Sequence, residues 1–400
     1  MAYQTGRQIE VAYKAEATYG ELPADPSGAK VFRPNSGNLT LGIEPIRSNE
    51  NRRDGMTTRG RHGTRSVTGQ YSGDLSVGSY DDMIEAVFRG TFDSAVTIDE
   101  NTAAMSSATL AVAAHTITAS GGSWITAGLR VGDVIRLTDG FLTANLNRNI
   151  RITGLTATVI TVAETLTVEA GPLSTYEIVR PKKVIQGVTN RSFSFEEREI
   201  DIDNSEIFKG VRVGQMQLQM QPNGMCILTF SLVGQDMEQK TGADSPYFTS
   251  PAETVTIGLT AVEAKVRLGA DDVMDISSID LTVNLNAAGN PVVGSNLTPD
   301  VFTNLATVEG SITALKADAT RVTQYLDEDE LSLHLLFEEN ETGAADFCAF
   351  HIGNMTLASA TKSDLGSDGA RTQTFQLMVG KDLRGGAYDP TMISFQTSAA

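Results

Sequence analysis

The sequence has few of the residues that form disulfides, cross membranes or bind metals. Only two of its 400 residues are cysteines, Cys226 and Cys348, so a disulfide framework is excluded and two buried free thiols are expected. No run approaches the roughly 18 apolar residues that a membrane-spanning helix needs. Residues 1–4 lack the apolar stretch of a secretory signal, so we expect synthesis in a reducing cytoplasm.

Positive charge is also scarce. Lys and Arg number 31 against 49 Asp and Glu, which gives a formal net charge of −18. A chain this acidic repels a polyphosphate over most of its surface, which argues against a nucleic-acid coat protein. A hydrophobic fraction of 40% with 37 glycines indicates a globular, turn-rich chain of two domains, or two plus an insertion.

Patterns that carry catalytic or metal chemistry are missing. The sequence has no Cys-x-x-Cys pair, no nucleophile elbow, no Walker loop and no dinucleotide fingerprint after a strand. Segment 201–206 resembles the start of a calcium loop, but it lacks the sixth-position glycine, and Arg212 occupies the twelfth position. None of the four histidines, His62, His115, His334 and His351, pairs with another at metal-ligand spacing. We therefore expect no catalytic residue, no metal and no cofactor.

Strand patterns dominate the chain. Met216, Leu218 and Met220 alternate with glutamines, and a second alternating run at 228–232 follows an Asn-Gly turn at 223–224. This pattern predicts a hairpin with one apolar face and one amide and hydroxyl face, in an antiparallel sheet. Further strands are predicted at 38–43, 65–77, 191–197, 278–285, 307–315, 331–338, 347–357 and 371–379.

Only two helices are predicted. Residues 80–89 begin with acids, end at Arg89-Gly90 and carry an apolar stripe at i, i+4 spacing, which suits an amphipathic helix. Residues 318–326 form a second, weaker pattern.

Residues 101–183 differ from the rest of the chain. They are rich in Thr and Ala, balanced between acids and bases, and contain short strand patterns separated by glycine turns. This spacing predicts a small SH3-like or OB-like barrel, displayed on the surface as an inserted domain.

The order of predicted elements repeats. Strand 38–41, a long polar segment, strand 66–75 and helix 80–89 are followed later by strand 278–283, a polar segment, strand 307–315 and helix 318–326. The repeat lies in element order and not in residue identity, so chance remains the alternative. The predicted organisation is a split first domain at 1–100 and 184–245, an insertion at 101–183, and a second domain at 246–400.

Three blocks outside the insertion share a pattern of strands, loop and helix. The first runs from SGNLTLGIEPIRS at 36–48 through VTGQYSGDL at 67–75 to the helix at 80–89. The second joins KKVIQGVTNRSFSF at 182–195 to FKG at 208–210 and the 216–232 hairpin, and the third contains TQTFQLMV at 372–379. This pattern resembles the tail tube (major tail) proteins of long-tailed, siphovirus-type bacteriophages.

The resemblance implies a mainly β fold: a tube-type β-sandwich or barrel with a flanking α-helix, duplicated, plus the small inserted β-barrel. It implies a structural protein of the virion tail, not an enzyme. Copies would join side by side into rings, either three chains with pseudo-sixfold symmetry or six chains, and the rings would stack into a tube for DNA ejection. Expected partners are further copies, the tape measure protein and tail-end proteins, with DNA only as non-specific cargo and no membrane.

The resemblance also gives roles to two charged segments. Segment 44–65 would be an arm to the next ring, where arginines pair with carboxylates. The alternative is a flexible, solvated loop without a partner. The predicted arm residues are Arg47, Arg52, Arg53, Arg59, Arg61 and Arg65. Candidate acids for an acidic lumen are Glu196, Glu197, Glu199, Asp201 and Asp203, with an outer solvated face as the alternative.

Two other function classes remain open from sequence alone. A β-rich surface adhesin could bind glycans through the insertion, with Trp124 on a sugar-binding face or, alternatively, in the core. A β-rich hydrolase is disfavoured because no acid–base constellation emerges, although paired carboxylates leave no sequence signature.

Overall fold

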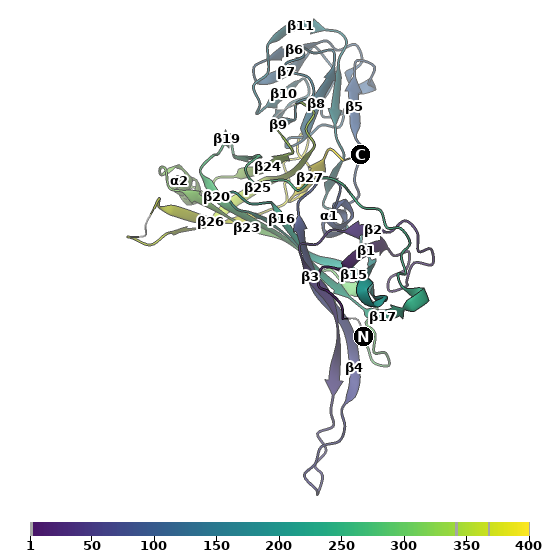
Figure 1. Ribbon diagram of the computed structural model, residues 1–400. Coiled ribbons are helices and arrows are strands. Elements are labelled where there is room, and N and C mark those ends of the chain that lie inside the picture. Colours follow the sequence, from purple (N-terminus) through teal and green to yellow (C-terminus); the bar gives the residue numbers. More distant parts are fainter. Residues whose placement is uncertain (1–2, 341–342, 367–368, 400) are drawn as a thin grey trace.

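The computed structural model describes residues 3–340, 343–366 and 369–399 and is mainly β. Figure 1 shows an elongated molecule with a small sheet at one end, a large sheet in the middle and a long two-stranded ribbon at the other end. The large sheet has 17 strands and the small one eight, and two further strands, β21 (Ala288–Gly289) and β22 (Val301–Phe302), pair separately. The expected mainly β class is confirmed.

Eight antiparallel strands follow one another through the large sheet, and we call them the central sheet. In spatial order they are β3 (Ser36–Ile46), β4 (Arg61–Asp74), β16 (Ile227–Gly234), β15 (Asn204–Met220), β20 (Ile276–Asn284), β23 (Thr307–Leu315), β26 (Thr372–Val379) and β25 (Phe347–Lys362). The predicted hairpin is confirmed, because Gln217 lies opposite Thr229 and Leu218 opposite Leu228 across the Asn-Gly turn.

Two long strands leave the central sheet and enter a second layer. The first half of β15 pairs with β14 (Phe193–Glu199) and β17 (Asp236–Thr241), and β14 continues to β1 (Ile9–Ala15) and β2 (Lys30–Phe32). The first half of β25 pairs with β24 (Leu331–Glu338) and β27 (Ser394–Thr397). Beyond these lie β18 (Ala264–Leu268), β19 (Asp271–Asp272) and β13 (Lys183–Ile185).

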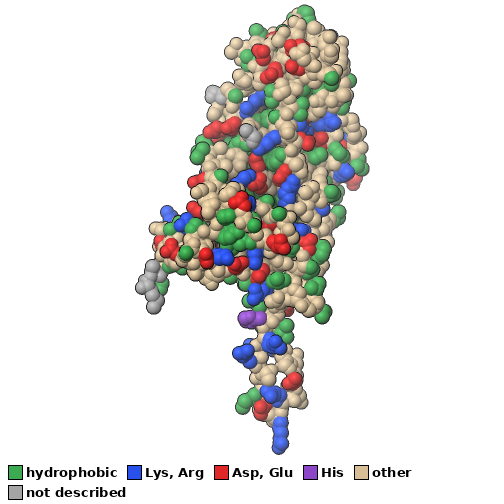
Figure 2. Space-filling model, turned by 90° about the vertical axis from the view of Figure 1, so that its right-hand side faces the viewer, with side chains coloured by type: hydrophobic (Ala, Val, Ile, Leu, Met, Phe, Trp, Pro, Cys, Tyr) green, Lys and Arg blue, Asp and Glu red, His purple; other side chains and the backbone are tan. Residues whose placement is uncertain are grey.

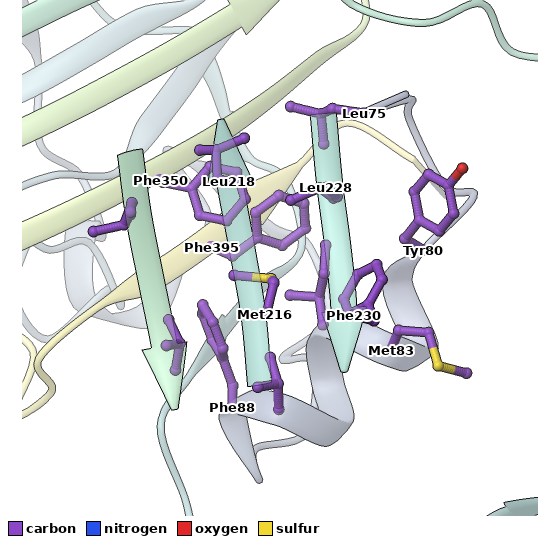
Figure 3. Close-up of a cluster of buried hydrophobic side chains, with 14 of the residues drawn as sticks. Leu75, Tyr80, Met83, Phe88, Met216, Leu218, Leu228, Phe230, Phe350 and Phe395 are labelled. Carbon is purple, nitrogen blue, oxygen red and sulfur yellow. The ribbon is translucent and has the colours of Figure 1, made fainter. Parts of the chain in front are cut away.

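Both predicted helices form, as α1 (Asp81–Phe88) and α2 (Thr320–Leu326). Helix α1 begins with two acids and ends at Arg89 in the left-handed conformation, as its dipole and stop pattern require. Its buried residues include Met83 and Phe88, which pack beside Met216 and Phe230 of the central sheet (Figure 3). Burial of each such side chain contributes about 1.5–3 kcal/mol, so this contact holds the helix on the sheet.

One continuous core lies between the central sheet and the second layer. It joins residues from both halves of the chain, for example Leu218 and Leu228 with Phe350 and Phe395 (Figure 3). The apolar residues of the alternating strands all face this core, which leaves their polar neighbours on the opposite face.

The insertion forms its own sheet around its own core. Trp124, Leu137, Ile150 and Ile178 are fully buried there. In spatial order the strands are β11 (Glu169–Leu173), β6 (Leu110–Ala113), β7 (Thr116–Ala119), β10 (Val159–Val162), β9 (Ile150–Leu155), β8 (Val134–Asp139), β12 (Glu177–Arg180) and β5 (Val96–Asp99). The expected small SH3-like or OB-like barrel does not close: among the described residues the edge strands β11 and β5 do not pair, so the sheet stays open.

The described residues also include short 3-10 helices at Ala103–Met105, Ile200–Ile202 and Gly242–Asp244.

Buried polar contacts fix the insertion to the second layer. The Lys183 ammonium pairs with Asp133 of the insertion and, at 2.8 Å, with Asp389. Gln396 of β27 bonds both main-chain groups of Val134, accepting from its N–H at 2.8 Å and donating to its carbonyl at 2.6 Å. Arg151 is 2% exposed and bridges Glu164 and Asp272. The insertion is therefore held against the second layer by buried hydrogen bonds and ion pairs.

Substitution of Lys183 by Met should loosen this docking. Asp133 is 1% exposed, and its burial raises its pKa, so loss of the neighbouring ammonium leaves a carboxyl without its partner. We expect the free energy of unfolding of the insertion to fall by about 3–5 kcal/mol.

The sole tryptophan, Trp124, lies in the insertion core, so urea unfolding followed by its fluorescence reports this region. Lys240→Met is the matched control, because it breaks the more exposed Lys240–Glu238 pair far from the insertion and should change little. An unchanged Trp124 transition in Lys183→Met would contradict the docking role.

Candidate functional site

One face of the central sheet is polar across all eight strands. The outward positions in the middle of the sheet carry amides and hydroxyls, with Asp74, Asp280 and Glu309 as the acids. The polar side chains on this face are Asn38, Thr40, Ser66, Thr68, Gln70, Ser72, Asp74, Thr229, Ser231, Gln215, Gln217, Gln219, Ser278, Asp280, Thr282, Asn284, Thr307, Glu309, Ser311, Thr313, Thr374, Gln376, Ser359 and Thr361. Three apolar residues share the face, Ile227 opposite Asp74, Val233 opposite Thr68 and Met378 opposite Glu309. No Lys or Arg is among these positions, but Arg212 shares the face near the bend of β15, because it lies opposite Val233, which lies opposite Thr68; it is 9% exposed and paired with Asp300 at 2.8 Å.

Cross-strand hydrogen bonds tie the polar face together. Asp280 accepts bonds from the amides of Gln217 at 2.8 Å and Gln219 at 3.2 Å. Hydroxyl pairs join Ser72 with Thr229 at 2.8 Å and Thr313 with Thr374 at 2.9 Å. The face is therefore an ordered, hydrated surface of weakly acidic character.

The central sheet ends in two open edges. Within the described ranges, β3 pairs only with β4, and residues 356–362 of β25 pair only with β26. Each open edge presents main-chain donors and acceptors that another strand can satisfy.

The predicted charged segment projects from the body as a ribbon. Strands β3 and β4 continue the pairing out to Ile46 and Arg61, so the loop proper spans 47–60 (Figure 1). Figure 2 shows basic side chains spaced along this projection, away from the rest of the molecule. Met56 near the tip is 69% exposed. We call residues 44–65 the arm.

The arm arginines fall into two groups. Arg65 lies at the base and is paired with Asp236 at 3.0 Å, so it anchors the ribbon to β17. In the part of the chain that the structure describes, no ion pair involves the remaining five, Arg47, Arg52, Arg53, Arg59 and Arg61, and their side chains are exposed. Five guanidinium groups are thus available to a partner.

The five candidate lumen acids lie in the second layer and not on the polar face. Glu196 is 1% exposed and accepts bonds from the main-chain N–H groups of Tyr247 at 2.7 Å and Phe248 at 2.8 Å. Glu197 accepts from the Leu39 N–H at 2.8 Å and from the Tyr71 hydroxyl. These two carboxylates are therefore used inside the fold, where Glu196 has no access to solvent.

The other three acids lie at the end of β14 (Glu199) and in the turn that follows it (Asp201 and Asp203). Glu199 accepts from the Asn204 amide at 2.6 Å, and Asp201 accepts from the Thr5 N–H at 2.8 Å. Asp203 is exposed and adopts the left-handed conformation at the start of β15. A cluster of acids in sequence is thus divided by the strand pleat and the turn into internal and external positions.

The chemistry-bearing residues do not converge. Among the described residues no group of three or more His, Cys, Asp or Glu has the arrangement of a metal site. His334 and His351 contact each other with ring centroids 5.3 Å apart, and burial lowers the pKa of His351 to about 4 and that of His334 well below its ordinary value.

Both cysteines are buried free thiols, as expected, and burial raises the pKa of Cys226 to about 12. Across the described helices, none is both long and apolar enough to cross a membrane. Trp124 is buried, with its indole N–H donating to the Thr158 carbonyl at 3.2 Å, so it is a core residue and not a sugar platform.

Comparison with known proteins assigns the family. No curated protein matches the chain. A family model described as phage tail tube protein matches residues 6–379, which is nearly the whole sequence and includes the arm, the insertion and all of the central sheet. The chain therefore belongs to the phage tail tube protein family, a structural component of the virion tail that assembles with other tail proteins and is not an enzyme.

Proposed function

We propose that copies of this chain polymerise into stacked rings of a siphovirus-type tail tube and that the polar face of the central sheet lines the channel through which DNA leaves. The observation that carries this proposal is the combination of that face with the two open edges of the same sheet. Edges that find partners in further copies extend the sheet around a ring, and the polar face then encloses solvent.

The composition of the polar face suits a conduit. Hydroxyls and amides keep it hydrated, while Asp74, Asp280 and Glu309 repel phosphate. The polar positions named above carry no Lys or Arg, and Arg212 near the bend of β15 is already paired with Asp300, which avoids the ion pairs and counterion release that would hold DNA in place. We therefore place the lumen on this face, in preference to the acids around β14.

Strand order supports a duplicated subunit and hence a ring of three chains. The first four strands of the central sheet follow the order β3-β4-β16-β15, and the next four follow β20-β23-β26-β25. In the first set the hairpin β3–β4 is followed, with other strands between, by α1, β14, β15 and β16. In the second set the hairpin β20–β23 is followed by α2, β24, β25 and β26. Six such sets from three chains would give the pseudo-sixfold lumen, with domains at 1–100 plus 184–245 and at 246–400.

Charge supports a role for the arm between rings. The arm holds six arginines against three acids, while the whole chain has a net charge of −18. Its five unpaired guanidinium groups are complementary to the acidic surface of another copy. The arm would thus join successive rings. The tape measure protein would occupy the lumen before DNA, and tail-end proteins would close the tube.

Shortening the arm should separate ring formation from stacking. A variant in which residues 48–59 are replaced by Asn-Gly keeps the paired strands up to Ile46 and Arg61. We expect a folded protein that forms single rings and no tubes in negative-stain electron microscopy.

A charge-reversed variant with Arg52, Arg53 and Arg59 each changed to Glu is the matched control for arm length. It should also fail to stack, because the arm keeps its shape and loses its attraction to an acidic partner. Tubes of normal length from both variants would refute the arm's role.

Excision of the insertion should leave tube formation intact. Replacing residues 100–176 by a short Gly-Ser linker keeps β5 and β12 and leaves both open edges of the central sheet untouched. Lys183 is kept, because the excision removes Asp133 but leaves its second partner, Asp389, at 2.8 Å. We expect thinner tubes by electron microscopy; a folded variant without tubes would show that the insertion builds the wall.

A further inference from the structure

The two open edges of the central sheet belong to β3 and β25. Each has a counterpart in the other set of four strands, β20 for β3 and β15 for β25, and β15 and β20 pair with each other inside the chain. We use this internal pairing as the model for the pairing between copies. The inference that follows rests on the proposed ring and specifies its contact.

The outer strand of each set has the same register. Leu39 of β3 lies opposite Gly69 of β4, and Leu281 of β20 lies opposite Gly310 of β23. In both cases a Thr follows the Leu and a Ser precedes it by three residues. Strand β3 therefore corresponds to β20, with Leu39 matching Leu281.

The long bent strands correspond as closely. The β15–β16 ladder shifts register between Val213 and Gln215, and the β25–β26 ladder shifts between Leu357 and Ser359. The ladders to the preceding strand shift at matching places too, between Phe193 and Phe195 on β14 and between Leu331 and Leu333 on β24. A shared pair of bulges fixes the correspondence, so Gln217 matches Thr361 and Leu218 matches Lys362.

Inside the chain, β15 and β20 pair antiparallel, with Gln217 opposite Thr282 and Leu218 opposite Leu281. The corresponding stretch of β25 and the corresponding edge of β3 have no partner within the described residues. We propose that β25 of one copy pairs antiparallel with β3 of the next copy, with Thr361 opposite Thr40 and Lys362 opposite Leu39. The occupant of each open edge is thus a second copy of this chain.

The neighbourhood of Leu39 is prepared for that strand. The Leu285 N–H donates to the Gly214 carbonyl at 2.9 Å, and the alternation of antiparallel ladders then makes Leu218–Leu281 a hydrogen-bonded pair. The matching Leu39 N–H has no strand to bond and donates instead to the Glu197 carboxylate at 2.8 Å. Glu197 therefore occupies the place of the missing strand's carbonyl.

Lys362 completes this arrangement in the proposed register. Opposite Leu39, its ammonium arrives beside the Glu197 carboxylate, whose pKa burial raises in the single chain. An incoming strand takes over the Leu39 N–H, and the released carboxylate gains a cation. A slip of two residues would place Ala360 or Asp364 opposite Leu39 and provide no cation.

The helices give independent support. Helix α1 contacts β15, where the internal junction lies, and buries Met83, Ile84, Val87 and Phe88. Helix α2 makes the matching contact with β25 but has no buried residue, and its Leu326 is 71% exposed. The buried apolar contacts that α1 makes beside the internal β15–β20 pairing are therefore missing from α2, which lies beside the open edge of β25.

Disulfide trapping of the full chain tests the register. Residues 40 and 361 would form a non-hydrogen-bonded pair, whose Cα separation of about 4.5 Å suits a disulfide. The variant with Thr40→Cys and Thr361→Cys, oxidised after assembly, should convert most chains into a covalently closed oligomer on non-reducing gels. The native thiols are buried and do not interfere.

Two matched pairs control the trapping. Gln217→Cys with Thr282→Cys reproduces the same geometry inside one chain and should form an intrachain disulfide with or without assembly. Thr40→Cys with Ser359→Cys is shifted by two residues on the same face and should cross-link about tenfold less. Efficient cross-linking of the shifted pair, with none at 40–361, would overturn the register.

Substitutions at Lys362 test its pairing with Glu197. Lys362→Glu places two carboxylates together and should raise the concentration needed for rings by about tenfold or more, whereas Lys362→Met, which copies Leu218, should assemble well. Equal assembly of Lys362→Glu and the parent would refute the ion pair. Tubes by electron microscopy without cross-links in either register would overturn this strand contact alone, whereas absence of rings in the parent chain would count against the proposed function.

Discussion

The unsatisfied main-chain groups at the sheet edges are the constraint on which the rest of the structure depends. A strand needs hydrogen-bond partners on both sides. Among the described residues, the central sheet lacks a second neighbouring strand along β3, along the arm part of β4 and along the second half of β25. The interior is complete without help, because one core joins both halves of the chain. The fold therefore has a complete core but lacks a neighbouring strand at each edge of the central sheet.

Alternation along the strands assigns the two faces of the sheet. Apolar residues such as Met216 and Phe230 hold α1 and the second layer on one side, so hydroxyls and amides collect on the other. The same pleat explains why clustered acids in the sequence do not form one acidic surface. Glu196 is buried, where two main-chain N–H groups satisfy it, whereas Asp203, farther along the same acidic cluster, is exposed.

Local patterns predicted much of the secondary structure. Strands β23 and β24 have their predicted bounds, the Asn-Gly hairpin has its predicted register, and both helices lie within a few residues of their predicted positions. The full length of β15 was not predicted from the sequence. Its alternation of apolar and polar residues changes phase at the bulge near Gly214, and its first half is buried on both faces. Barrel closure of the insertion depends on whether β11 meets β5, a contact between distant segments that no local pattern encodes. The role of Glu197 depends likewise on Leu39, far away in sequence.

The insertion sits on only one of the two strand sets, held by Gln396 and Lys183 against the layer that β24, β25 and β27 build. The first set carries no equivalent addition among the described residues. In a ring closed through the proposed edges, the exterior would therefore repeat once per chain, whereas the lumen would repeat twice per chain. Proteins that dock on the exterior would encounter widely spaced projections, while cargo in the bore would meet a nearly uniform wall.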